Sequence, residues 1–188
     1  SVWGDIATIL PHTLYRFYGD KTLLEKHYPM IENYICHLKG IDEENGGRRL
    51  YHTGFHFGDW LAQDGVSPQA LKGGTDDYYI ASLYYYYSVG IAAETSLILG
   101  RTSAHQEYVQ LQEEIKQSIL AEYFSPNGRL TIDTQTGYVL SLYFGVYVDK
   151  ERIIEGFKQR LAKDFFKIKC GFVGTPLICS VLCDNGMA

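Results

Sequence analysis

The sequence predicts an all-α protein built as an α/α-toroid, in which an inner ring of buried helices is enclosed by an outer ring of amphipathic helices. Two observations predict this fold. Helical segments with almost no charge alternate along the chain with segments that carry one apolar stripe and one charged face. Clusters of polar and aromatic residues come just before the apolar segments, so they would gather at one end of a barrel. An ordinary helical bundle explains the periodicity but not this repeated placement.

The first two helices show the alternation. Residues 5–18 carry almost no charge apart from one arginine and should form a buried helix that Gly19 closes. The next helix begins at Asp20, a good N-cap, and is amphipathic, and Pro29 should kink or divide it. After Gly40 comes a glycine-dotted loop, residues 41–74, which is too long to be a mere connector.

The middle of the chain repeats the pattern. Thr75 is the expected N-cap of a long apolar helix over residues 75–99, with two aspartates in its first turn. Four consecutive tyrosines, residues 84–87, point in every direction around its axis, so packing partners must surround this helix. The next helix, residues 103–124, is again amphipathic.

The last third contains three helical segments. An uncharged run, residues 139–148, follows a polar cluster at residues 134–138. Residues 150–163 then form a charged helix with one apolar stripe. A final apolar run, residues 177–182, follows Pro176, which suits a first helical turn.

Length and composition indicate one globular domain, residues 1–188, because 46% of the residues are apolar and 21% are charged. A net charge of −5 without a Lys/Arg-rich run argues against binding to nucleic acid or to an anionic membrane. No apolar run is long enough to cross a bilayer. The chain starts without Met, so a targeting segment could have been lost and the localisation stays open.

The long loop carries the most informative stretch, residues 54–61, in which Asp59 and His56 lie among Phe55, Phe57 and Trp60. Pyranose rings stack on indoles while their hydroxyls need acceptors, so Asp59 followed by Trp60 is a candidate carbohydrate contact. The alternative, which this segment alone favours, is that the three aromatic side chains plug the end of the helical core. We interpret His56 as an ordinary surface or core histidine.

No metal or cofactor is expected. Cys179 and Cys183 have the i,i+4 spacing that could hold zinc together with an outside histidine, but small buried thiols explain them better. Asp76 and Asp77 are similar to the metal-binding carboxylates of terpene-cyclase-like helical enzymes. No further aspartate follows in the next turn, so a magnesium site would be incomplete.

Five motifs occur along the chain: Trp3-Gly4-Asp5 with Tyr18-Gly19-Asp20, Phe57-Gly58-Asp59-Trp60-Leu61, Thr134-Gln135-Thr136-Gly137-Tyr138, Gly171-Phe172-Val173-Gly174-Thr175-Pro176 and Asp184-Asn185-Gly186. Together they resemble, in order and spacing, the catalytic barrel of bacterial α-L-rhamnosidases over essentially the whole chain. The resemblance implies a partial (α/α)6 barrel of about seven helices that acts, by inversion, on terminal α-L-rhamnose of glycosides.

The same resemblance implies a sugar-binding shell. Two tryptophans would line the rhamnose subsite, two aspartates would accept its hydroxyls, and a glutamine and a threonine could reach the same pocket. Capping of the first and fifth helices is the competing role for Asp5 and for the Gln135-Thr136 pair. The candidate substrate-binding residues are Trp3, Asp5, Asp59, Trp60, Gln135 and Thr136.

The resemblance also exposes a gap in the catalytic residues. Inverting hydrolysis needs a general acid and a general base on carboxyls roughly 6.5–9.5 Å apart. The family's Asp-Glu-Arg type segment for the acid and its glutamate segment for the base are both missing from residues 1–188. We therefore assign no catalytic residue, expect inactivity of this chain alone, and expect self-association through open barrel edges. A non-catalytic helical carbohydrate-binding or interaction module is the alternative function.

Overall fold

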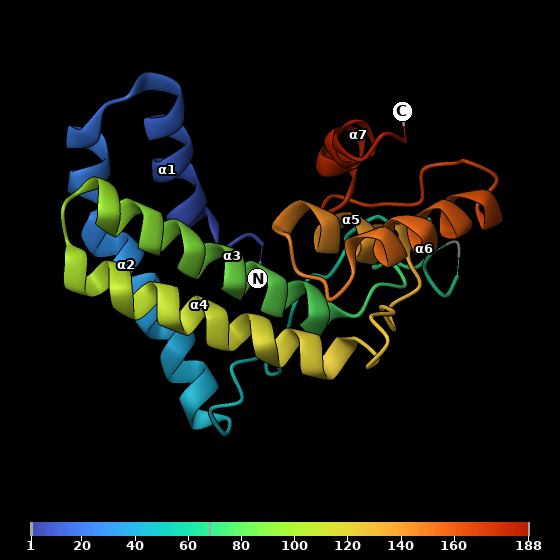
Figure 1. The fold of residues 1–188 in the computed structure, drawn as a ribbon, viewed down its shortest axis with the longest axis horizontal. Helices are drawn as coiled ribbons and strands as arrows, with labels where there is room; N and C mark the ends of the chain where they lie inside the picture. The colour runs from blue at the N-terminus through green and yellow to red at the C-terminus, as the bar shows by residue number, and fades with distance from the viewer. Residues whose placement is uncertain (1, 68, 188) are drawn as a thin grey trace. The chain divides into compact units, whose positions relative to one another are not determined.

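The computed structural model describes residues 2–67 and 69–187, and over these residues the protein is all-α, as predicted (Figure 1). Its only extended pairings there are two isolated bridges, Trp60 with Lys72 and Phe124 with Leu130. The described residues form seven helices: α1 (Ile6–Tyr18), α2 (Lys21–Glu44), α3 (Asp77–Ile98), α4 (Thr102–Tyr123), α5 (Gln135–Phe144), α6 (Lys150–Lys163) and α7 (Thr175–Asp184).

The chain divides into two compact units. The first comprises Ser1–Thr53 and Tyr84–Ser118, and the second comprises Gly54–Leu83 and Ile119–Ala188. Helices α3 and α4 therefore contribute residues to both units.

In the first unit, α1 packs against α2 after a sharp turn at Gly19 (Figure 1). Gly19 has φ 69°, a left-handed conformation that glycine adopts without steric cost. The Asp20 carboxylate accepts a 2.9 Å hydrogen bond from the Thr22 amide, so the predicted N-cap is confirmed. One face of α2 forms the core of this unit, with Leu24, Tyr28, Ile31, Ile35 and Leu38 buried.

Helix α2 is longer than its sequence predicts. It runs undivided through Pro29 and continues past Gly40 to Glu44, so the irregular segment begins at Asn45 rather than at residue 41. A tertiary contact favours the extra turn, because the buried Asp42 carboxylate accepts hydrogen bonds from the Arg49 amide at 2.9 Å and from its guanidinium at 3.1 Å.

Helix α3 is largely buried, but the prediction that packing partners surround it is confirmed only in part, since Tyr84 and Tyr85 of the tyrosine run are buried whereas Tyr86 and Tyr87 are half-buried. Its predicted N-cap is wrong. The helix begins at Asp77, and the Asp76 carboxylate accepts a 2.7 Å hydrogen bond from the Tyr79 amide. Thr75 instead forms a 2.7 Å hydrogen bond with the Thr134 hydroxyl, so its side chain is used in a tertiary contact.

In the second unit, α5 packs against both α6 and α7. Residues 135–142 of α5 are buried, whereas α6 buries only Ile153 and Phe157, which gives the expected pairing of an inner and an outer helix. Pro176 lies in the first turn of α7, as predicted. Cys179 and Cys183 are exposed, so the interpretation of these cysteines as small buried thiols is wrong.

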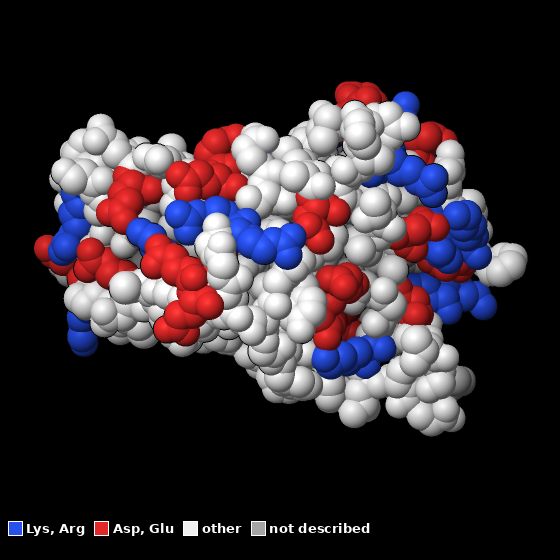
Figure 2. Space-filling model, turned by 90° about the horizontal axis from the view of Figure 1, so that it is seen from below, with Lys and Arg blue, Asp and Glu red and all other residues white. Residues whose placement is uncertain are grey.

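Acidic and basic side chains lie interspersed with one another on the face drawn in Figure 2. None of the helices in residues 2–67 and 69–187 is both long and apolar enough to span a membrane.

Candidate functional site

Backbone hydrogen bonds join residues 59–61 to residues 71–73 and thereby fix Asp59 and Trp60. Trp60 forms an antiparallel bridge with Lys72. The Leu61 amide donates to the Leu71 carbonyl at 2.7 Å, and the Gly73 amide donates to the Asp59 carbonyl at 3.0 Å. The candidate carbohydrate motif thus lies on a loop that backbone hydrogen bonds hold in place.

Asp59 is the point at which three segments of the second unit meet. Its side chain is buried, with the residue 1% exposed. The carboxylate accepts hydrogen bonds from the Thr136 hydroxyl at 2.5 Å, the Gly171 amide at 2.8 Å and the Val173 amide at 2.8 Å. These bonds join the loop to the start of α5 and to the segment before α7. Because three donors already occupy the carboxylate, it offers little remaining capacity for a sugar hydroxyl.

Two glycines allow the backbones to approach this closely. A Cβ atom at Gly171 would lie 2.3 Å from the Trp60 carbonyl oxygen, and one at Gly174 would lie 2.5 Å from the Thr136 hydroxyl oxygen. Sequence reasoning recognised these glycines only as part of a motif. Their role in packing depends on contacts with residues more than 30 positions away.

Three aromatic side chains form what we call the aromatic strip: Phe55, Phe57 and Trp60. Phe57 meets Trp60 edge to face with centroids 5.7 Å apart, and Phe55 meets Phe57 in the same way at 5.1 Å. Phe55 is 70% exposed, Phe57 is 40% exposed and Trp60 is partly exposed. Phe55 and Phe57 therefore do not plug the end of the helical core, whereas for the partly exposed Trp60 the choice between a core and a ligand-binding role stays a prediction.

The first unit contains a comparable arrangement around Asp5. This residue is 1% exposed, and its carboxylate accepts from the Val2 amide at 2.5 Å, the Ser88 hydroxyl at 2.8 Å and the Tyr34 hydroxyl at 3.1 Å. Burial and the neighbouring Asp5 charge raise the pKa of Tyr34 well above its ordinary value. Trp3, two positions before Asp5, is 43% exposed.

Asp5 precedes α1, but its side chain makes no capping hydrogen bond to that helix. Helix capping therefore does not explain this carboxylate, since its hydrogen bonds go to other parts of the first unit. Trp3 belongs to the first unit and Trp60 to the second.

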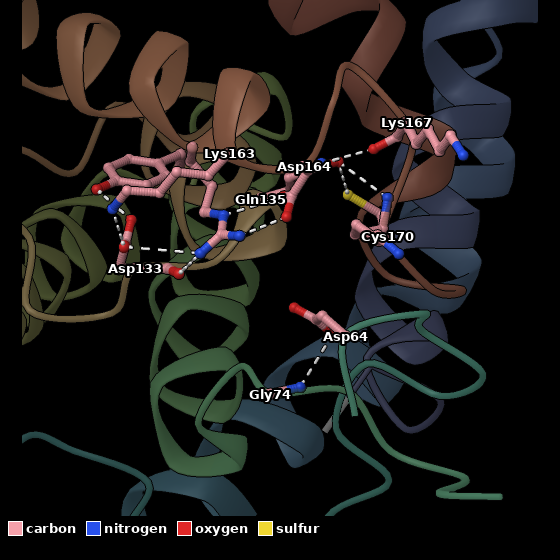
Figure 3. A network of polar contacts seen from close by, with 11 residues as sticks. Asp64, Gly74, Asp133, Gln135, Lys163, Asp164, Lys167 and Cys170 are labelled. Atoms are coloured by element: carbon pink, nitrogen blue, oxygen red, sulfur yellow. Dashed lines mark hydrogen bonds and ion pairs between the residues drawn. The ribbon is translucent and has the colours of Figure 1, made fainter. Parts of the chain in front are cut away.

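Gln135 and Thr136 do not cap α5 either. Thr134 does so, because its hydroxyl accepts a 3.1 Å hydrogen bond from the Gly137 amide. Gln135 is buried, and its amide group donates to the Asp164 carboxylate and to the Lys167 carbonyl, both at 2.8 Å (Figure 3). Its carbonyl oxygen accepts from the Lys169 amide at 3.0 Å. The residue therefore ties the start of α5 to the segment that follows α6.

The pKa shifts of the ionisable side chains around Gln135 are those expected of groups that stabilise the fold. Burial opposes ionisation of Asp164, but hydrogen bonds from Arg160 and Gln135 outweigh it and lower the pKa of Asp164. Burial, together with the charges of Asp59 and Asp164, raises the pKa of Asp64, although its carboxylate accepts from the Gly74 amide at 3.0 Å (Figure 3). Burial also raises the pKa of the Cys170 thiol to about 12, so it stays protonated at neutral pH.

A cavity of about 460 Å³ lies beside Phe55 and is also lined by Lys72, Asp77 and Tyr78. Sequence reasoning missed Lys72, because a single lysine in a long loop carries no distinguishing signal. Its ammonium group pairs with the Asp77 carboxylate at 2.5 Å and donates to the His56 carbonyl. Within residues 2–67 and 69–187, no group of three or more His, Cys, Asp or Glu side chains could hold a metal ion.

Comparison with known proteins gives a consistent result. The family model for the bacterial α-L-rhamnosidase six-hairpin glycosidase domain matches residues 1–188. The chain is 31% identical over 192 residues to an α-L-rhamnosidase of Alteromonas sp. (strain LOR), covering 99% of this chain and 20% of that protein. It is 30% identical over 189 residues to an α-L-rhamnosidase of Streptomyces avermitilis, covering 98% of this chain and 17% of that protein.

Solved structures agree with the sequence matches. A native α-L-rhamnosidase from Aspergillus terreus superimposes with a TM-score of 0.88 at 26% identity, over 100% of this chain and 22% of that chain. The Streptomyces avermitilis α-L-rhamnosidase complexed with L-rhamnose gives a TM-score of 0.83 at 25% identity, over 97% of this chain and 16% of that chain. The chain thus spans about a fifth of the length of the relatives that it matches.

Proposed function

This chain belongs to the bacterial α-L-rhamnosidase six-hairpin glycosidase domain family, and from that premise we propose that it supplies part of a pocket for the terminal α-L-rhamnose of a glycoside. Six hairpins need more helices than the seven described, so the chain is part of such a barrel. The observation that carries the proposal is the pairing of a partly exposed Trp60 with a buried, fully engaged Asp59.

In this proposal each tryptophan is a candidate sugar contact of its own unit, and the neighbouring aspartate holds it in place. Rhamnose carries a C6 methyl group, and this methyl and the apolar ring face suit an indole. Trp60 follows Asp59 directly, and Trp3 lies one residue from Val2, whose amide donates to Asp5. Gln135 and Thr136 act indirectly, without contacting the sugar, since Thr136 donates to Asp59 and Gln135 orders the start of α5.

The chain by itself supplies a binding surface rather than an acid–base pair. Protonation of the leaving oxygen and activation of water each need a carboxyl that can exchange a proton with the reacting atoms. The two buried aspartates of the motifs have their oxygens occupied by three donors each. Incubation of the purified 188-residue chain with an aryl α-L-rhamnoside should therefore give no enzymatic release of the phenol. Turnover that Asp5→Asn or Asp59→Asn abolishes would contradict this assignment.

Tryptophan fluorescence tests the binding role, because Trp3 and Trp60 are the only tryptophans of the chain. Addition of L-rhamnose should change the emission, and L-fucose should change it much less. A partial pocket should bind with a dissociation constant no better than about millimolar, or about 4 kcal/mol. Trp60→Ala should remove most of the response while the helical circular dichroism stays intact. Loss of the helical signal in this variant would instead make Trp60 a core residue.

We also infer that the isolated chain self-associates through apolar faces on each unit. In the first unit, Ile6, Leu10 and Met30 are exposed beside a groove of about 250 Å³ between α1 and α2. In the second unit, Phe166 and Ile168 are exposed beside a groove of about 390 Å³ that α6 and α7 line. Exposed apolar patches of this kind commonly drive association in water.

A further inference from the structure

The aromatic strip continues away from Trp60 and ends at the cavity beside Phe55. Each ring in the strip meets the next edge to face, at interplanar angles of 83° and 81°. Exposure increases along the strip, from the partly exposed Trp60 to Phe57 and then to Phe55. The cavity of about 460 Å³ at its far end is within the usual range for small-ligand sites. All of these residues lie in the second unit.

The polar groups at the far end of the strip are already paired with one another. Lys72 forms its ion pair with Asp77 and lies 4.6 Å from the centroid of the Phe55 ring, where a cation is attracted to the ring face. The Asp76 carboxylate accepts from the Tyr79 amide. The cavity therefore combines the exposed Phe55 ring with Lys72, Asp76 and Asp77, whose side chains already make hydrogen bonds or ion pairs.

Because Gly58 has no side chain, the Asp77 carboxylate can lie close to the strip. The φ of Gly58 is 61°, and a Cβ atom there would lie 1.9 Å from an Asp77 carboxylate oxygen. The Asp77 carboxylate of the Lys72–Asp77 pair therefore packs directly on the backbone between Phe57 and Asp59.

We propose that Phe55 and Phe57 bind the planar aromatic leaving group of a phenolic α-L-rhamnoside. This rests on the proposed function, because it takes the rhamnose ring to lie at Trp60. A flat aromatic group gains from stacking on phenylalanine and needs few hydrogen bonds. A second sugar would need several open acceptors for its hydroxyls, and here the available carboxylates are engaged with Lys72 and the Tyr79 amide.

The test is a ligand-observed NMR titration of the 188-residue chain with phenyl α-L-rhamnoside, methyl α-L-rhamnoside and an α-L-rhamnosyl-glucose disaccharide. The phenyl compound should bind about fivefold more tightly than the methyl compound, the gain expected from one or two aromatic contacts. Phe55→Ala should reduce that preference to within about twofold and leave the affinity for the methyl compound unchanged, and Phe57→Ala should also reduce the preference to within about twofold. Phe55→Tyr should keep the preference.

Phe17→Ala is the matched control, since Phe17 is 81% exposed on α1 and lies in the other unit. It should leave the preference unchanged. If the methyl and phenyl compounds bind equally, or the disaccharide binds more tightly than the phenyl compound, the aromatic leaving-group site is refuted while rhamnose binding stands. If only the phenyl compound binds, and does so through Phe55, the strip is upheld and the rhamnose pocket is refuted. If no compound binds, both proposals fail.

Discussion

The Thr136 hydroxyl donates a 2.5 Å hydrogen bond to the Asp59 carboxylate across 77 positions of sequence. The same carboxylate accepts from the Gly171 and Val173 amides, so one buried side chain fixes the loop, α5 and the segment before α7 together. A residue in this position acts on the neighbouring Trp60 by holding its backbone.

Asp59→Ala should destabilise the protein by at least about 3 kcal/mol, because it leaves three buried donors without an acceptor. Thr136→Val should cost less, about 1–2 kcal/mol, since both backbone donors remain. Urea unfolding followed by circular dichroism measures both effects, and Asp184→Ala, at an exposed position, should change stability by less than about 0.5 kcal/mol. If Asp59→Ala is as stable as the parent but loses rhamnose binding, Asp59 is a direct sugar ligand instead.

Gly171→Ala should destabilise the protein by about 2–3 kcal/mol, because its new methyl group would lie 2.3 Å from the Trp60 carbonyl oxygen and force the backbones apart. Gly40→Ala is the matched control. Gly40 lies inside α2 with nothing within 4 Å of its added Cβ, so alanine should stabilise the helix by about 0.5–1 kcal/mol. Gly171→Ala should lower the midpoint of thermal unfolding and Gly40→Ala should raise it. Equal shifts would argue against a close approach of the Gly171 and Trp60 backbones.

Leu10→Glu and Ile168→Glu should each weaken self-association, because a charge in an apolar contact must be desolvated. Sedimentation velocity over a wide concentration range measures the effect. Val109→Glu, at a similarly exposed position on the amphipathic α4, is the control and should leave association unchanged. A parent chain that stays monomeric at every concentration would refute the proposed association.

Asp164→Asn should remove part of the acid dependence of stability. The folded-state pKa of Asp164 is lowered, so its contribution is present above the ordinary aspartate pKa and is lost as pH falls through the lowered value. The raised pKa of Asp64 acts in the opposite direction, because its protonation in acid favours the folded state.

The Asp164→Asn variant should therefore be less stable than the parent by about 1–3 kcal/mol at pH 7, since Arg160 and Gln135 lose a charged acceptor. The difference should shrink as pH falls below about 4. Urea unfolding at pH 7 and pH 3 tests this, with Asp184→Asn as the control. A difference that is equal at both pH values would show that the ionised carboxylate of Asp164 contributes nothing.

The sequence alone determined the features that depend on local periodicity and on short-range capping. Alternating apolar and amphipathic segments predicted seven helical segments, although α1, which was predicted to be buried, buries only Thr8, Pro11 and His12. Asp20 was identified as a cap because its partner Thr22 is two residues away, and the ordered motifs identified the family. The placement of Trp3, Trp60 and their neighbours around a sugar stays a prediction.

Only the tertiary structure decided what the buried polar side chains do. In the sequence, Asp5 suited a helix cap as well as a sugar ligand, Asp59 was expected only to accept a sugar hydroxyl, and Gln135 again suited either a cap or a ligand. Their actual partners, Ser88, Gly171 and Asp164, lie 83, 112 and 29 positions away. A buried hydrogen-bonding group must be satisfied by whatever donor or acceptor the packing brings within about 3 Å, and that neighbour has no signature in local sequence.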